Sequence, residues 1–153
     1  MNALDIKKLL RKRHADPREW VYIEECPTGA GGRLERFLDA WAMSCWPSER
    51  NRRVAFEIKV SRVDFRSEVL NPNKRRNALF FSNEFYFVTP KGLVKPEELP
   101  ADCGLMEADS DKLEIKIRSP YRDSIRPTWN FMAAVLRHQG RKIKVVEEVP
   151  HGR

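Results

Sequence analysis

The segment 53–60, Arg-Val-Ala-Phe-Glu-Ile-Lys-Val, constrains the fold more than any other part of this chain. Side chains along a strand point alternately to its two faces, so every second position of the segment, beginning at Val54, forms a wholly apolar face. The opposite face carries Glu57 and Lys59. We therefore expect a core strand that bears two charged groups on one side.

The remaining pattern places this strand in a mixed α/β domain. Three successive strands joined by short loops predict an antiparallel meander, and the helical stretch after the third strand predicts a crossover to a parallel strand. A loop is expected at Pro27–Gly32. We expect a single domain over residues 1–140, followed by a charged tail over residues 141–153. The expected elements are helices at 4–14, 61–70, 73–81 and 127–140, and strands at 20–26, 37–45, 53–60, 84–89, 105–107 and 113–117.

Four residues define the expected buried side of the closing helix: Trp129, Met132, Ala133 and Leu136, at i, i+3, i+4 and i+7. Gly140 is expected to end this helix, because glycine commonly follows a helix C-terminus. The large aromatic side chains Trp41, Trp46, Tyr86 and Trp129 are expected in the core.

Charge and composition restrict the partners. The chain has 29 Lys and Arg against 22 Asp and Glu, a net charge of +7, which favours a polyanion such as nucleic acid. No apolar run approaches a membrane span, and the N-terminus lacks a secretory signal, so we expect a cytoplasmic protein. Three widely spaced cysteines argue against a disulfide framework or a disulfide-linked partner.

The charges on the central strand suggest chemistry. Burying Glu57 and Lys59 in a core strand without compensation is costly, and a metal ion with a phosphate would compensate them. Asp39, 18 residues upstream in the preceding strand, could approach Glu57 across a hairpin. Two hard carboxylates with backbone carbonyl and water ligands suit Mg²⁺ or Mn²⁺.

A plainer interpretation stays open, because Glu-x-Lys on a strand is also typical of a solvated face with a cross-strand pair. The chain contains a second copy of the pattern at Glu114 and Lys116. The acids upstream of that copy, Asp109 and Asp111, lie in the turn that leads into its strand, and Ser119-Pro120 follows it. We interpret Glu114 and Lys116 as surface charges.

Several motifs together resemble the MmcB-like branch of the PD-(D/E)XK nucleases. They are Glu25-Cys26-Pro27 with the glycine loop, the run from Arg36 to Asp39, Phe56 to Arg62 with Asp64-Phe65, Glu84 to Pro90, and Leu99-Pro100 to Gly104-Leu105-Met106. The resemblance covers roughly residues 20–108. It implies a restriction-endonuclease-like αβββαβ core with a mixed central sheet flanked by helices, and a role in DNA repair or phage DNA metabolism.

The resemblance also implies residue roles. Asp39 and Glu57 would bind Mg²⁺ or Mn²⁺ together with the backbone carbonyl of Ile58, and Lys59 would assist catalysis. Glu25 matches an acid at the end of the family's first strand and is included in the catalytic set, although its neighbour Glu24 is an alternative. Leu38 stands where the family usually has a proline.

Basic and helix-capping residues are candidates for DNA contact. Ser61 and Arg62 could touch phosphate, but plain N-capping with a solvated arginine is the favoured interpretation. The run Lys74, Arg75 and Arg76 either follows a DNA backbone or is a solvated face, and Arg36 is a further candidate.

We therefore predict an Mg²⁺-dependent nuclease that hydrolyses DNA phosphodiester bonds. One alternative is a DNA-binding module of the same fold that does not cleave. Another is a protein-interaction factor, such as a phage-encoded inhibitor. A homodimer and a monomer are both compatible with the sequence.

Overall fold

A computed structural model describes residues 1–28, 36–123 and 127–147, with side chains described as far as Lys142. The predicted loop at Pro27–Gly32 falls largely outside these residues, as does the end of the tail, 148–153. The elements are α1 (Ala3–Arg13), β1 (Trp20–Pro27), β2 (Phe37–Ser44), η1 (Pro47–Glu49), β3 (Arg53–Ile58), α2 (Arg62–Leu70), η2 (Pro72–Arg75), α3 (Arg76–Phe81), β4 (Glu84–Pro90), η3 (Pro96–Glu98), β5 (Gly104–Asp109), β6 (Lys112–Ile117) and α4 (Trp129–Glu147).

The strands form one six-stranded mixed sheet in chain order, β1 to β6. β1, β2 and β3 are antiparallel neighbours, as the predicted meander requires. The crossover through α2, η2 and α3 returns the chain to β4, which pairs parallel with β3, and β5 pairs parallel with β4. β5 and β6 form the predicted hairpin at the edge. The expected mixed α/β architecture is confirmed.

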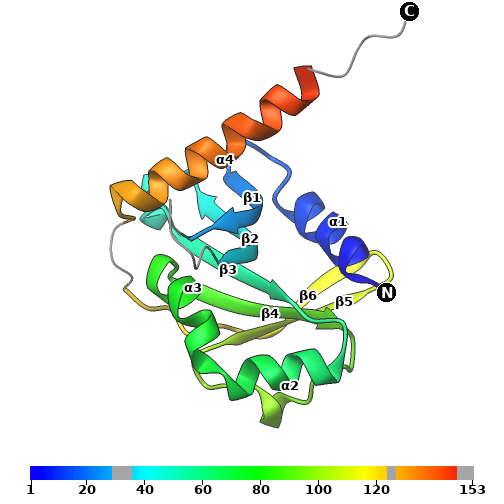
Figure 1. The fold of residues 1–153 in the computed structure, drawn as a ribbon. Helices are drawn as coiled ribbons and strands as arrows, with labels where there is room; N and C mark the ends of the chain where they lie inside the picture. The colour runs from blue at the N-terminus through cyan, green and yellow to red at the C-terminus, as the bar shows by residue number, and fades with distance from the viewer. Residues whose placement is uncertain (29–35, 124–126, 148–153) are drawn as a thin grey trace, which may run out of the picture.

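Helices cover both faces of the sheet (Figure 1). On one face, Ile6 and Leu10 of α1 pack in a cluster with Phe56 and Val88. On the other face, α2, α3 and α4 contribute apolar side chains to a second cluster around Phe87. This three-layer arrangement buries both sides of the central strands, as is usual where strands pair in parallel.

Strand β3 is shorter than expected. It ends at Ile58 rather than Val60, so Lys59 follows the strand instead of lying within it. The Lys59 amide still donates to the Val88 carbonyl at 3.1 Å, which continues the β3–β4 pairing by one bond. Val60 is 38% exposed and does not extend the apolar face of the strand.

The predicted buried side of the closing helix is wrong except at Met132, which is partly buried and packs against the core. Trp129 is 90% exposed and Leu136 is 66% exposed, whereas Phe131, Ala134 and Val135 are buried. The second stripe has the same helical spacing but is shifted by two residues. Aromatic contacts favour burial of this second stripe, because the ring centroid of Phe131 lies 4.4 Å from that of Phe81 and 5.5 Å from that of Trp41. Trp46, 51% exposed, is likewise not a core residue.

The predicted end of this helix is also wrong, because α4 continues through Gly140 to Glu147. A glycine in a helix interior costs only about 1 kcal/mol relative to alanine, which packing against the sheet can offset. Residues 141–147 therefore belong to the helix rather than to a separate tail. Although α4 has 19 residues, no helix in the described part of the chain is long and apolar enough to cross a membrane.

Two glycine substitutions test this description in opposite directions. An added Cβ at Gly140 meets nothing within 4 Å, so Gly140→Ala should raise the free energy of unfolding by about 0.5–1 kcal/mol. A Cβ at Gly104 would overlap the Tyr86 ring and lie 2.6 Å from the Ser119 amide nitrogen, so Gly104→Ala should lower it, by about 1–3 kcal/mol. Urea unfolding measures both, and a loss of stability in Gly140→Ala would contradict the continuous helix.

Candidate functional site

Antiparallel pairing of β2 and β3 brings the first two predicted acids together. Ala40 lies opposite Phe56, and continuing this register by one residue places Asp39 opposite Glu57. The Asp39 carboxylate accepts a hydrogen bond from the Ile58 backbone N–H at 2.8 Å. Cross-strand partners share a face of the sheet, so both carboxyl groups lie on the side covered by α2, α3 and α4.

Lys59 completes this group. Its Nζ lies 2.7 Å from Oε1 of Glu57, and only 15% of the Lys59 side chain and 19% of the Glu57 side chain are exposed. The two charges on the strand therefore compensate each other at close range. The structure brings together Asp39, Glu57 and Lys59, the three residues at the centre of the sequence prediction.

A fourth member of the group, Glu68 on α2, was missed by the sequence prediction. Its side chain is 8% exposed and approaches two cations, Lys59 at 3.6 Å and Lys74 at 3.8 Å. A signal was present, because Glu68 follows the core residue Phe65 by three positions and so falls on the same side of the helix. An acid on the buried side of a helix needs a partner, and here the partners are lysines.

We call Asp39, Glu57, Lys59 and Glu68 the acid–lysine cluster. Burial and the nearby charge of Asp39 raise the pKa of Glu57 from its ordinary 4.5 to about 7, with a smaller contribution from Glu68 and an opposing one from Lys59. Burial lowers the pKa of Lys59, but Glu57, Glu68 and Asp39 together outweigh that effect and raise it. Lys59 is therefore protonated at neutral pH, whereas Glu57 can exchange a proton there.

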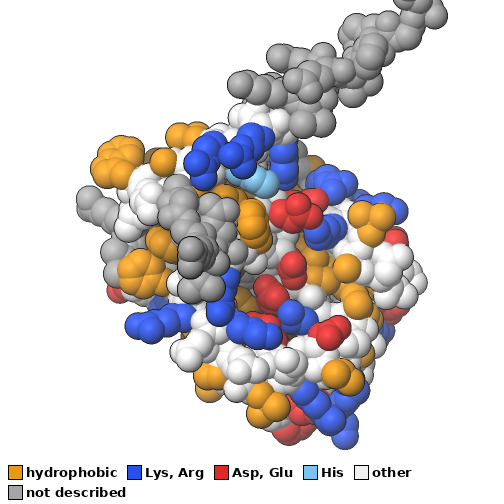
Figure 2. Space-filling view, in the orientation of Figure 1, with side chains coloured by type: hydrophobic (Ala, Val, Ile, Leu, Met, Phe, Trp, Pro, Cys, Tyr) orange, Lys and Arg blue, Asp and Glu red, His pale blue; other side chains and the backbone are white. Residues whose placement is uncertain are grey.

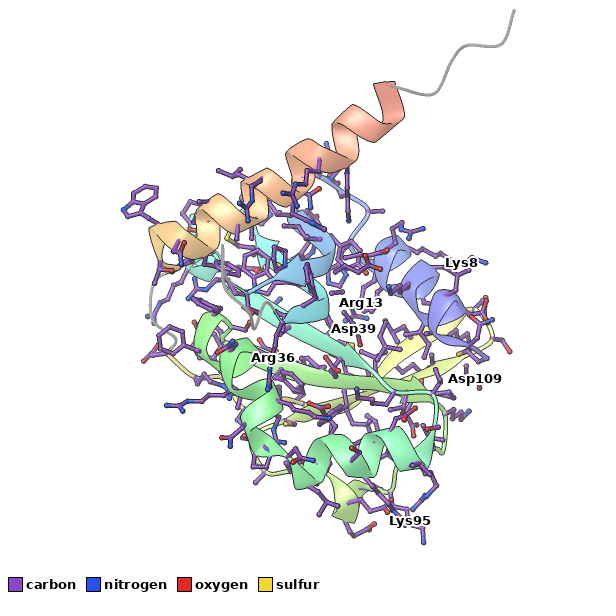
Figure 3. All side chains as sticks on the ribbon, in the orientation of Figure 1. Lys8, Arg13, Arg36, Asp39, Lys95 and Asp109 are labelled. Carbon is purple, nitrogen blue, oxygen red and sulfur yellow. The ribbon has the colours of Figure 1, made fainter. Side chains whose placement is uncertain are left out.

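The cluster borders a cavity of about 350 Å³, which we call the central pocket. Its lining includes Glu57 and Glu68, three basic residues (Arg36, Lys74 and Arg75) and the amide of Asn77. In Figure 2, acidic side chains lie in a hollow at the centre of the view, with Lys and Arg side chains above and below it. Arg36 and Asp39 lie in this central region, between α4 and α2 (Figure 3).

Glu25, predicted as catalytic, does not join the cluster. It adopts a left-handed backbone conformation with φ of 53°. Glu24 pairs with Ala40 and Cys26 pairs with Leu38, so Glu25 has no partner on β2. This bulge turns Glu25 toward α1, where its carboxylate lies 3.3 Å from Nζ of Lys7 and is 63% exposed. Glu24 is held on the same side by Arg11 at 2.8 Å, so the alternative acid is not in the cluster either.

The residues after β3 have structural partners. Ser61 is the N-cap of α2, accepting a hydrogen bond from the Asp64 amide at 3.1 Å, which agrees with the favoured interpretation. Arg62 donates to the Leu93 carbonyl at 3.0 Å and to Glu98 at 2.6 Å. Its guanidinium is thus paired with Glu98, although 38% of the Arg62 side chain is exposed.

The basic run does not form one surface. Arg75 is buried, with its guanidinium 3.6 Å from Asp102, while Lys74 is partly exposed beside Glu68. Arg76 begins α3 and is exposed. Arg36, which lines the central pocket, donates to the Asn73 carbonyl at 3.3 Å. Lys74, Arg75 and Arg36 therefore belong to the pocket, whereas Arg76 lies outside its lining.

The second Glu-x-Lys pattern lies on the edge strand β6, where Glu114 and Lys116 are exposed, as expected for surface charges. The two copies of the pattern differ in burial and in neighbours. Glu114 also has an acid opposite it, Glu107 on β5, but Glu114 is exposed. Glu57 is largely buried, and Asp39 and Glu68 of the covering helix α2 both lie near it.

The donor set of the cluster consists of hard carboxylate oxygens, the ligand type that Mg²⁺ and Mn²⁺ prefer. Within residues 1–28, 36–123 and 127–142, no three or more Asp, Glu, His or Cys side chains are arranged as a metal site. A divalent cation at the cluster would thus depend on Asp39 and Glu57, with the remaining ligands from backbone and water. Burial and the charge of Asp39 both disfavour the ionised form of Glu57, and a cation between the two carboxylates would stabilise that form.

The pKa of Glu57 is open to direct test by ¹³C NMR titration of the metal-free protein in EDTA. We expect a midpoint near 7 in the wild type and a lower midpoint in Asp39→Asn, which removes a negative charge yet keeps an acceptor for the Ile58 amide. Asp109→Asn, a change at a surface ion pair with Lys91, should leave the midpoint unchanged.

The same shift predicts a pH dependence of stability. Because the folded-state pKa of Glu57 lies above its unfolded value, the folded protein binds more protons between about pH 4.5 and pH 7. The Glu57 contribution to the free energy of unfolding should therefore fall as pH rises through this window, and it should fall less in Asp39→Asn. Equal pH dependence in both proteins would exclude coupling between the two carboxyl groups.

No protein-family model matches the chain, and no curated protein sequence matches it. Among solved structures, the SPO1766 protein of unknown function from Silicibacter pomeroyi is similar over 99% of this chain and 98% of that chain, with a TM-score of 0.66 and 20% sequence identity. At this identity the similarity concerns the fold alone. The chain thus shares its mixed α/β fold with a protein whose function is not assigned.

Proposed function

We propose that this protein is a metal-dependent nuclease that hydrolyses DNA phosphodiester bonds, in DNA repair or phage DNA metabolism. The observation that carries the proposal is the meeting of Asp39, Glu57 and Lys59 at the edge of a pocket with basic walls. The order of elements supports it, since α1, three antiparallel strands, a helical crossover and a parallel strand follow the αβββαβ pattern of restriction-endonuclease-like nucleases.

In this proposal Asp39 and Glu57 would hold Mg²⁺ or Mn²⁺, and the backbone carbonyl of Ile58 would be a further ligand. The bound cation would polarise the phosphoryl group and make a water molecule more acidic. A water oxygen then bonds to phosphorus while the bond to the leaving strand breaks. The proton of the water passes to solvent, and the leaving oxygen takes up a proton.

The role of Lys59 follows from its charge state. A lysine whose pKa is raised keeps its proton at neutral pH, so it is unsuited to remove a proton from water. A fixed ammonium group can instead stabilise negative charge that develops on the phosphate. Glu68 holds this ammonium group from the side of α2, at 3.6 Å, and acts as a positioning residue.

Cleavage of DNA in the presence of Mg²⁺ or Mn²⁺ tests the catalytic assignment. Lys59→Ala should reduce the rate at least about 100-fold, because it removes a preorganised positive charge. Lys116→Ala provides a matched control, since it removes the lysine of the second Glu-x-Lys pattern on an exposed strand, and it should cleave like the wild type. Circular dichroism would verify that both variants fold. If Lys59→Ala cleaves as fast as Lys116→Ala, Lys59 has no catalytic role.

Isothermal titration calorimetry with Mn²⁺ tests the metal assignment separately. We expect binding by the wild type, weaker binding by Asp39→Asn, and unchanged binding by Glu114→Gln, the matched change in the exposed pattern. Binding should release protons near pH 7, because a cation favours the ionised form of Glu57. No heat at millimolar Mn²⁺ would favour the alternative of a DNA-binding module that does not cleave.

A further inference from the structure

The central pocket carries features that bear on the kind of substrate. Its volume of about 350 Å³ falls at the lower end of the range of about 300–1,000 Å³ typical of small-ligand sites. It therefore has room for one nucleotide but not for a base-paired duplex. The Glu57 side chain, in the lining of this pocket, is only 19% exposed.

Access to Glu57 thus sets a geometric condition on the substrate. A phosphate on the outer surface of an intact duplex would have to reach a carboxylate that is recessed within the pocket. An unpaired strand can enter with a base or a sugar in advance of its phosphate. Enzymes that modify bases meet the corresponding problem of access, and they act on single-stranded substrate or flip the target nucleotide out of the duplex.

The walls of the pocket offer contacts for each part of a nucleotide. Arg36 and Lys74 carry charge for the phosphates, and the buried Arg75 has an Nε–H with no acceptor among the described residues. Asn77 donates to the hydroxyl of Thr28 at 3.4 Å, and its amide oxygen, which accepts no hydrogen bond from the described residues, can accept one from a base edge.

An aromatic surface borders the same pocket. Phe37, at the start of β2, belongs to the pocket lining and is 51% exposed. Its ring centroid lies 6.1 Å from that of His138 on α4. An exposed aromatic ring beside cationic groups is the common device for binding single strands, because every base can stack on it.

We propose that the central pocket binds one unpaired nucleotide, so that the substrate is a single strand, a flap or a frayed end rather than continuous duplex. Cleavage of the bound strand rests on the proposed nuclease function. Binding of the strand to the pocket does not depend on that function. The pocket binds DNA or RNA through the same stacking and phosphate contacts.

Fluorescence anisotropy in EDTA tests this binding without cleavage. The probes are a labelled single-stranded DNA of about 12 nucleotides, the same strand in a blunt duplex, and an RNA of the same sequence. We expect the single-stranded DNA to bind at least about tenfold more tightly than the duplex, and the RNA arm shows whether the sugar is discriminated. Equal or tighter binding of the duplex, or no binding of either single strand, would overturn the proposal.

Matched variants assign the binding to the pocket. Phe37→Ala and Lys74→Ala should each weaken single-strand binding about tenfold, and Phe37→Trp should restore it. Trp129→Ala removes an aromatic ring that is 90% exposed outside the pocket, and Lys91→Ala removes an exposed lysine elsewhere. If these two controls weaken binding as much as the pocket variants do, the pocket is not the site.

The outcomes separate this inference from the proposed nuclease activity. Tight single-strand binding without Mg²⁺-dependent cleavage would leave the inference standing and remove the nuclease. Cleavage of intact duplex, with single strands bound no more tightly than duplex, would leave the nuclease standing and remove the inference.

Discussion

The hydrogen bond from the Ile58 amide to the Asp39 carboxylate is the interaction on which the candidate site depends. It joins β2 to β3 where their pairing ends, and it fixes the side chain of Asp39 beside Glu57. A shift of one residue in this register would turn Asp39 to the α1 face of the sheet and leave Glu57 without an acid on the adjoining strand. The pairing of two strands thus decides whether the chain has a site at all.

The position of Asp39 beside Glu57 determines how the charges of the cluster are balanced. Asp39, Glu57 and Glu68 concentrate negative charge in a partly buried place, and Lys59 offsets only part of it. Removing one partner from such a group leaves an uncompensated buried charge, which is strongly unfavourable. Lys74 reaches Glu68 from η2 and extends the balance to the basic wall of the pocket. The charged groups of the cluster and those of the pocket wall therefore interact directly, and a change in one group alters the electrostatics of the other.

The accuracy of the sequence prediction varied with the range of the interactions involved. The elements and the meander were predictable, because apolar alternation and turn residues act over a few positions. The buried side of α4 was not, since two stripes of equal spacing exist and only contact with Trp41 and Phe81 distinguishes them. The family resemblance placed Glu25 at the site, but a bulge in β1 interrupts the alternation of side chains there and turns Glu25 toward α1.

By itself, the sequence determined the strand that carries Glu57 and leads into Lys59, the order of the elements, and an excess of basic residues. These depend on local propensity and composition. Only the tertiary structure decided that Glu68 joins the cluster, that Glu25 does not, and that Arg75 turns inward while Arg76 stays exposed. The positions of these side chains depend on packing between elements that are distant in the chain. A buried charged side chain is stable only where another segment supplies an opposite charge.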